Sequence, residues 1–83
     1  MQVRLGPRAT KELLDLPRAD RDRIEARIAA YAADPASRFH DVKPIVGTVG
    51  GFRLRVGIWR VLFELDGDRM NVKRVAHRRE AYR

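Results

Sequence analysis

Apolar residues at helical spacing organise the first half of the chain. The first five residues predict a short β-strand that ends at Gly6, and Pro7 suits the first turn of a helix. Ala9, Leu13 and Leu16 then follow at i, i+4 and i+7, which is the spacing of one face of an α-helix. We therefore expect a strand followed directly by a short amphipathic helix.

A second amphipathic helix is predicted over residues 18–33. Ile24, Ile28 and Tyr31 form its apolar stripe, and the charged residues around them mostly face solvent. Pro35 disfavours helical geometry at the residue before it, so the helix should end near residue 33. The two helices together are expected to form a helical hairpin.

The second half of the chain predicts β-structure. Val42 begins a short extended segment, which Pro44 would confine to a sheet edge because proline donates no ladder hydrogen bond. A flexible turn is expected at residues 48–51. Three further strands are expected at residues 52–56, 59–65 and 69–76. The predicted fold class is α+β, a single domain over residues 1–83 whose N-terminal strand and helical hairpin pack on one face of a small antiparallel β-sheet.

Turn signals between these strands predict tight hairpins. Gly57-Ile58 matches a two-residue type II′ turn, and Asp66-Gly67 matches a two-residue type I′ turn. Two-residue loops fix which residues lie opposite one another on the core side of the sheet. The expected core pairs are Val56 with Trp59, Leu54 with Val61, Phe52 with Phe63, Phe63 with Met70, and Val61 with Val72.

The opposite side of the sheet is then predicted to be basic. Its expected members are Arg53, Arg55, Arg60, Leu62, Glu64, Arg69, Asn71, Lys73, Val75 and His77. Two rows across the three strands are expected, Arg55–Arg60–Lys73 and Arg53–Leu62–Asn71. Glu64 should face Arg69 as an ion pair, but nothing in this register neutralises the first row. We expect a concave anion-binding face, and a solvated row without a ligand is the alternative.

Composition adds an uneven charge to this pattern. The 83 residues carry a formal net charge of +7, with 8 basic and 6 acidic residues (+2) up to residue 40, and 10 basic and 5 acidic (+5) from residue 41. A basic patch is typical of proteins that bind nucleic acid or an acidic protein, although a merely solvated surface is the alternative. The chain has no cysteine for a disulfide or metal site, and no signal peptide or membrane span is predicted. We expect a cytoplasmic protein.

Two stretches of the chain resemble the RelE/ParE superfamily of toxin–antitoxin toxins. They are GFRLRVGIWRVLFEL at residues 51–65 and RVAHRREAYR at residues 74–83, and VKPIVG from Val42 resembles the segment that precedes the family's sheet. The resemblance implies a RelE-like toxin that cuts mRNA at the ribosomal A site without a metal, or a ParE-like toxin that poisons DNA gyrase. In both branches a cognate antitoxin binds and suppresses the toxin.

The resemblance also implies roles for single residues. Arg53 and Arg55 match two basic catalytic residues, and Arg60 matches an arginine that stabilises the phosphate. Arg78 matches an arginine proposed as general acid, and Tyr82 matches a tyrosine that stacks on or orients the substrate. Packing of Tyr82 against the sheet edge is the alternative. The best-known members carry lysine at the first two positions, and arginine is a poor base, so the general base stays open.

Side-chain chemistry suggests further candidates. Histidine is the side chain whose unperturbed pKa lies near neutrality, so His77 could act as acid or base or simply lie in the substrate groove. His40 and Glu64 are weaker candidates, because His40 lies between elements and Glu64 is expected to pair with Arg69. Trp59 is expected in the core rather than stacked on a base. RNA-binding residues are expected to be Arg53, Arg55, Arg60, Lys73, Arg79 and Arg83. No metal or cofactor is expected.

The leading hypothesis is a metal-free endoribonuclease in which arginines stabilise the phosphorane. A gyrase inhibitor without nuclease chemistry is one alternative, and a decayed member that binds only antitoxin or nucleic acid is another. Expected partners are the cognate antitoxin, the ribosome and mRNA. The resemblance implies that operator DNA is bound only through the antitoxin, and no membrane contact is expected.

Overall fold

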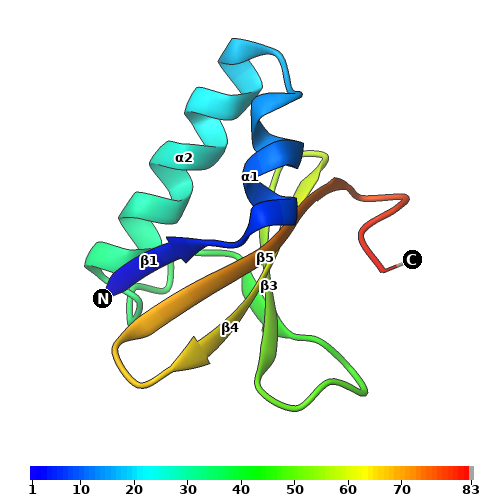
Figure 1. Cartoon of the computed structure of the whole chain (residues 1–83). Helices are drawn as coiled ribbons and strands as arrows, with labels where there is room; N and C mark the ends of the chain where they lie inside the picture. Colours follow the sequence, from blue (N-terminus) through cyan, green and yellow to red (C-terminus); the bar gives the residue numbers. More distant parts are fainter. Residues whose placement is uncertain (83) are drawn as a thin grey trace.

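The computed structural model describes residues 1–82 and shows two helices packed on one face of a five-stranded sheet (Figure 1). The elements are β1 (Gln2–Leu5), α1 (Pro7–Leu14), α2 (Arg18–Ala33), β2 (Val42–Pro44), β3 (Gly51–Val56), β4 (Trp59–Asp66) and β5 (Arg69–His77). The strand order is β1-β5-β4-β3-β2. The predicted α+β class is confirmed, and β2 lies at a sheet edge as Pro44 required. β1 pairs with β5 in parallel, whereas the other neighbouring strands are antiparallel.

The core lies between the helices and the sheet. Leu13 of α1 and Ile24, Ile28 and Tyr31 of α2 are buried there, as the helical spacing predicted. The fully buried Phe63 of β4 lies at its centre, with ring centroids 5.2 Å from Tyr31 and 5.7 Å from Phe52. The strand residues that complete the core are Leu54, Val56, Val61, Met70, Val72 and Val75.

The β3–β4 hairpin has the predicted register. Gly57 has a φ of +59°, and no non-glycine residue within residues 1–82 has a positive φ, as a type II′ Gly57-Ile58 turn requires. Arg55 therefore lies opposite Arg60, and Arg53 lies opposite Leu62. Trp59 packs half-buried against the core, as expected.

The predicted β4–β5 turn was wrong. Asp66 continues β4 and pairs with Arg69, so the loop is Gly67-Asp68, with Gly67 at a φ of +58°. A type I′ turn at Asp66-Gly67 would force Asp66 into the left-handed region, whereas the observed loop gives that conformation to glycine alone. Opposed pairs now include Leu65 with Met70, Phe63 with Val72, and Glu64 with Asn71. The expected Glu64–Arg69, Phe63–Met70 and Val61–Val72 pairs are therefore wrong.

A β-bulge in β5 changes the register again. Phe63 pairs with Val72 but the preceding Leu62 pairs with Arg74, so Lys73 is the extra residue. Beyond the bulge, the side chains of β5 point to the opposite faces from those predicted. Val75 consequently lies opposite Val61 in the core, not on the basic face. The bulge lets valine enter the core and keeps the charged Arg74 out of it, which avoids a costly burial of charge.

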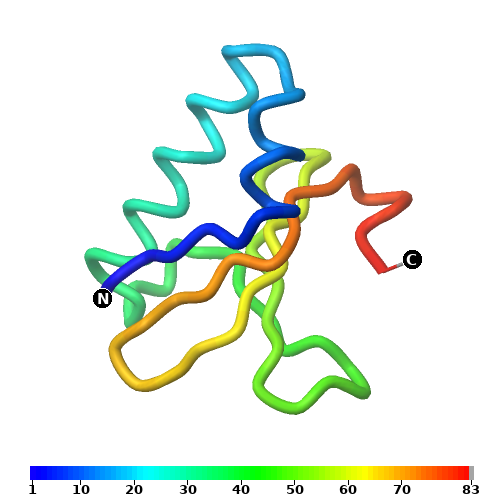
Figure 2. The backbone as a smooth tube through the Cα atoms, viewed as in Figure 1, coloured from blue at the N-terminus to red at the C-terminus, as the bar shows by residue number. Residues whose placement is uncertain are grey.

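Two segments extend beyond the packed layers. Figure 2 shows the β2–β3 loop projecting from one end and the C-terminal segment turning back after β5. Val46 and Val49 on that loop are almost completely exposed. Within residues 1–82, neither helix combines the length and apolar character needed to cross a bilayer.

Phe63→Ala should lower the free energy of unfolding by about 3–5 kcal/mol, because it removes the central core ring and leaves a cavity. Urea unfolding measures the loss. Phe39→Ala is the matched control, since Phe39 is 84% exposed and its truncation should change stability by less than about 0.5 kcal/mol. Equal effects of the two substitutions would contradict the assignment of Phe63 to the core.

Candidate functional site

Arginines gather on the sheet face that the helices leave uncovered. Arg55 and Arg60 lie directly opposite each other on β3 and β4. Opposed residues in an antiparallel pair are about 5 Å apart, and like charges at that spacing repel. In the third strand, Arg60 lies opposite Ala76. The first predicted row is therefore correct for Arg55 and Arg60 but wrong for Lys73.

Arg60 is held at the centre of this cluster. Its Nη1 donates hydrogen bonds to the carbonyl oxygens of Gly57 at 2.8 Å and Trp59 at 3.0 Å. Burial is the largest cause that lowers the pKa of Arg60 from its ordinary value, and the charges of Arg55 and Arg53 lower it further. Arg78 acts in the same direction, whereas Tyr82 opposes it. All four of these neighbours therefore act on Arg60 electrostatically, and arginine still stays protonated at neutral pH.

Asp41 neutralises part of the cluster, which the sequence did not reveal. Arg53 Nη1 donates to Asp41 Oδ1 at 3.0 Å, and Arg55 Nη1 lies 4.0 Å from Asp41 Oδ2. The backbone fixes this arrangement, because Arg55 N–H donates to the Asp41 carbonyl at 2.9 Å. The hydrogen bond from Arg53 lowers the pKa of Asp41, with burial opposing and the charges of Arg53, Arg55 and Lys43 assisting. Asp41 therefore remains ionised and orients Arg53.

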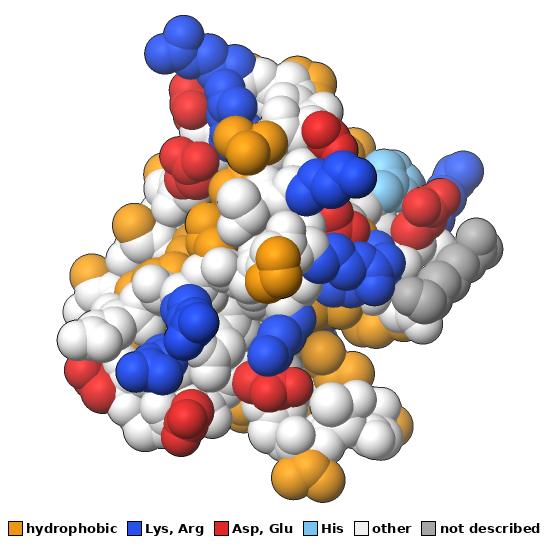
Figure 3. Space-filling model, viewed as in Figure 1, with side chains coloured by type: hydrophobic (Ala, Val, Ile, Leu, Met, Phe, Trp, Pro, Cys, Tyr) orange, Lys and Arg blue, Asp and Glu red, His pale blue; other side chains and the backbone are white. Residues whose placement is uncertain are grey.

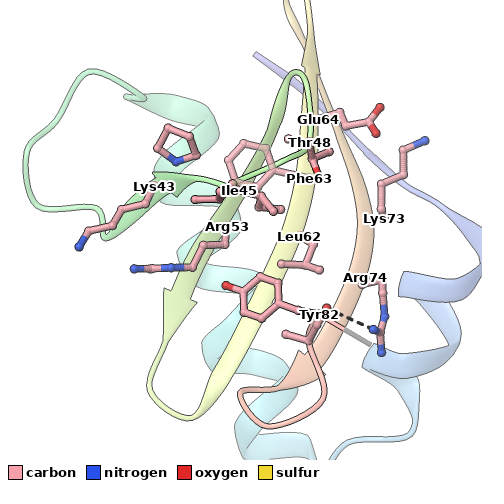
Figure 4. Close-up of a pocket in the computed structure, with 14 residues that line it drawn as sticks. Lys43, Ile45, Thr48, Arg53, Leu62, Phe63, Glu64, Lys73, Arg74 and Tyr82 are labelled. Carbon is pink, nitrogen blue, oxygen red and sulfur yellow. Dashed lines mark hydrogen bonds between the residues drawn. The ribbon is translucent and has the colours of Figure 1, made fainter.

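A groove of about 650 Å³ runs along this face (Figure 4). Its walls come from the β2–β3 loop on one side and the C-terminal segment on the other, and its floor includes Leu62. Charged lining residues are Lys43, Arg53, Glu64, Lys73 and Arg74. The Tyr82 ring extends from the C-terminal segment over the sheet toward Arg53. Arg53 and Lys73 of the expected basic face line this groove, whereas Arg55 and Arg60 do not.

The bulge determines which cations reach the groove. It places both Lys73 and Arg74 on the groove side, so the second predicted row continues from Leu62 to Arg74 rather than to Asn71. Arg74 Nη2 donates to Glu12 Oε2 of α1 at 3.1 Å. Glu12 Oε1 also accepts a hydrogen bond from the Val75 N–H at 3.0 Å. Neither Glu12 nor Arg74 was predicted as a site residue.

The C-terminal segment, residues 78–82, carries three of the predicted residues. Tyr82 is exposed and lines the groove, and Arg78 influences Arg60 electrostatically. Arg79 is exposed beside them, with its N–H donating to His77 Nδ1 at 3.2 Å. Arg83 lies outside the described residues. Figure 3 shows blue Lys and Arg side chains over the sheet and near this segment, with acidic side chains between them.

The two histidines lie away from the arginine cluster. His77 is opposite Trp59, with ring centroids 5.8 Å apart, so it faces the Trp59 side of the sheet rather than the basic side predicted for it. The bulge causes this change of face. His40 Nε2 lies 2.9 Å from the Asp34 carbonyl, just beyond the end of α2, and its ring contacts Tyr31.

The missed residues had no local signal. Asp41 precedes β2, Glu12 lies on α1, and Arg74 would have pointed to the core without the bulge. Only the pairing of β2 with β3 and the packing of α1 beside β5 join them to the groove.

Comparison with known families identifies the chain. Residues 3–82 match the model of the ParE toxin of the type II toxin–antitoxin system parDE. The chain belongs to this toxin family. A search of curated proteins found no significant match.

Solved toxin structures share the fold. In the RelB–RelE antitoxin–toxin complex from Methanococcus jannaschii, a chain 29% identical superposes with a TM-score of 0.78, over 94% of this toxin and 93% of that chain. A RelBE toxin–antitoxin complex from Mycobacterium tuberculosis gives 29% identity and a TM-score of 0.61, over 92% and 95% of the two chains. Isolated Escherichia coli RelE toxin, at 14% identity, gives 0.74 over 92% and 82%. The resemblance to the RelE/ParE superfamily is confirmed.

Asp41 provides a pH test of the cluster. A carboxyl with a depressed pKa stabilises the folded toxin above its unfolded pKa, and this contribution is lost as pH falls through the folded pKa. The NMR titration midpoint of Asp41 should lie below 3.8, and Arg53→Ala should raise it. Arg23→Ala, on α2, should leave the midpoint unchanged. A midpoint insensitive to Arg53→Ala would refute the proposed Asp41–Arg53 pairing.

Proposed function

We propose that this toxin is a metal-free endoribonuclease that cuts mRNA in the ribosomal A site. The observation that carries the proposal is the Arg55–Arg60 pair, with Arg53, Arg78 and Tyr82 close enough to influence Arg60. A core-building sheet gains nothing from opposed arginines, whereas a phosphate placed between them would relieve their repulsion.

The arrangement suits stabilisation of charge on a phosphorane. Once a base has taken the 2′-OH proton, attack by the 2′-oxygen on the adjacent phosphorus adds negative charge to the phosphate oxygens, and preorganised cations stabilise that charge most in the transition state. Arg60 is already held by two carbonyls, and Arg53 by Asp41. Both guanidinium groups therefore lose little conformational entropy when they bind phosphate. Planar guanidinium groups also grip phosphate through two parallel hydrogen bonds.

Proton transfer to the leaving 5′-oxygen is assigned to Arg78. The segment after β5 brings Arg78 near Arg60, whereas His77 faces Trp59 and its Nδ1 accepts the Arg79 N–H. Tyr82 lines a groove whose volume, about 650 Å³, is within the range of ligand-binding pockets. Its ring can stack on a base and orient the scissile phosphate. Lys73, Arg79 and Arg83 are proposed to contact the RNA backbone farther from the cut.

Gyrase inhibition is the second candidate function. The observation that favours it is the family model, which describes a ParE toxin, whereas the structural relatives named above are RelE toxins. An inhibitor of gyrase would use the basic face for protein contact and would need no general acid. A decayed member that only binds its antitoxin would keep the fold but have no activity on either target.

Arg60→Ala should reduce the single-turnover cleavage rate of mRNA on programmed ribosomes by about 10²–10³, the usual cost of losing one well-placed phosphoryl stabiliser. Arg60→Lys should restore the rate only in part, because lysine keeps the charge but lacks the planar fork. Arg23→Ala, which removes an arginine from the opposite layer, is the matched control and should cleave normally.

Two further variants separate the acid–base schemes. Arg78→Ala should be as severe as Arg60→Ala, while His77→Ala should be nearly silent. If His77 carries the proton instead, its loss should cost about 10²–10⁴ in rate. Undiminished toxicity in both Arg60→Ala and Arg78→Ala would eliminate the nuclease hypothesis, and a DNA supercoiling assay would then test gyrase inhibition.

We also propose a cognate antitoxin with an acidic, partly disordered tail. Relatives of this toxin were solved in complex with antitoxins, and the net charge of +7 favours an acidic partner. Val3 and Leu5 on β1 are partly exposed beside an apolar groove of about 210 Å³ that Leu13 and Ile28 also line. The tail is proposed to cover this apolar groove and the basic face of the sheet. Action on ribosome-bound mRNA would place the toxin in the cytoplasm, with operator DNA reached only through the antitoxin.

Co-expression with the neighbouring gene should yield a complex with a higher melting temperature than the free toxin, since a partner that binds only the folded state stabilises it. Arg55→Ala should reduce the salt dependence of affinity, because it removes one screened charge contact. Leu5→Asp should weaken binding without removing that salt dependence. A melting temperature unchanged by the neighbouring protein would contradict the partner proposal.

A further inference from the structure

Arg74 joins three parts of the molecule that are distant in sequence. Its Nη1 donates to the carbonyl oxygens of Glu80 at 3.1 Å and Ala81 at 3.3 Å, which belong to the C-terminal segment. Its Nη2 donates to Glu12 Oε2 on α1. The dashed line in Figure 4 marks a contact between Arg74 and this segment beside Tyr82. One guanidinium group therefore links the sheet, the first helix and the end of the chain.

Glu12 holds this guanidinium group in place. Both of its carboxylate oxygens are used, one by Arg74 and the other by the Val75 N–H. The side chains of Arg74 and Glu12 are only 15% and 23% exposed, so solvent screens their attraction less than at an open surface. Arg8 Nε lies 3.8 Å from the same carboxylate and adds a more exposed charge. Arg74 is thus oriented before any substrate arrives.

The segment that Arg74 holds has few other attachments. Arg78 N–H donates to the Ile58 carbonyl at 2.7 Å, and Glu80 N–H donates to the His77 carbonyl at 2.8 Å. Ala81 is buried, but Tyr82 beside it is 60% exposed. The segment forms no strand or helix of its own, so these contacts must set its position.

We infer that Arg74, fixed by Glu12, is a positioning residue that holds the C-terminal segment, with Tyr82 at the groove and Arg78 just after the end of β5. The inference rests on the proposed nuclease function, because it assigns to Arg74 the geometry of that reaction rather than a contact with the reacting atoms. Lysine could keep the ion pair with Glu12, but its single ammonium cannot present the rigid fork that spans a carboxylate and two carbonyls. We call the hydrogen bonds of Arg74 to Glu12, Glu80 and Ala81 the clamp. The clamp therefore requires arginine at this position.

Amide hydrogen exchange by NMR tests the clamp without reference to activity. In Arg74→Lys, exchange at the Arg78 and Glu80 amides should accelerate about 10- to 100-fold, the effect of losing one charge-assisted hydrogen bond. The Val61 and Phe63 amides in the central strand should be unchanged. Glu12→Gln keeps an acceptor for Val75 but loses the charge, so it should give a smaller acceleration. Arg18→Ala, an exposed arginine on α2, is the matched control.

Cleavage kinetics on programmed ribosomes test whether the position of the C-terminal segment affects catalysis. Arg74→Lys should lower kcat by about 10²-fold, the cost of misplacing catalytic groups by about 1 Å, with KM little changed. If amide hydrogen exchange at residues 78–80 is unchanged in Arg74→Lys, the clamp is wrong. If exchange accelerates but kcat stays normal, Arg74 holds the segment without positioning it for catalysis. If wild-type toxin does not cleave, the proposed function fails, while the exchange data still decide whether Arg74 holds the segment.

Discussion

One extra residue in β5 sets how the second half of that strand contributes to both the basic face and the core. The bulge at Lys73 turns both Lys73 and Arg74 toward the groove and sends Val75 into the core. It also lies where β1 no longer pairs with β5, because that ladder ends at Val72. The Val75 N–H would be left without a strand partner there, and Glu12 supplies the acceptor. Core packing, backbone hydrogen bonding and groove chemistry therefore depend on a single break in the ladder.

The cations are kept close together by a few well-placed acids. Asp41 holds Arg53 and approaches Arg55, while Glu12 holds Arg74. Each pair orders a guanidinium group and lowers the repulsion within the face. Asp41 and Glu12 do not cancel the charge, because these two carboxylates contact Arg53, Arg55 and Arg74 and leave Arg60 without an acidic partner among the ion pairs described within residues 1–82. A face that is ordered but still net positive is what a polyanion, or an acidic partner, would bind most favourably.

Family membership and chemistry answer different questions about this toxin. The family model and the solved relatives establish a type II toxin–antitoxin toxin with the RelE-type fold. That fold can carry different activities, so the target must be argued from the site. The opposed Arg55 and Arg60, with Arg53 on the same face, are a property of the site, and the nuclease proposal rests on them.

Local patterns in the sequence determined the elements, the first hairpin and much of the core. The i, i+4, i+7 spacing fixed both helices, and Gly57 fixed the register that opposes Arg55 to Arg60, because only glycine adopts that turn without strain. Tertiary structure decided the rest. The second turn moved by one residue, and the bulge reversed the faces of Arg74, Val75 and His77, because burying valine and exposing arginine outweighed an unbroken ladder. The Asp41–Arg53 and Glu12–Arg74 contacts join residues 12 and 62 positions apart, so no local pattern could have predicted them.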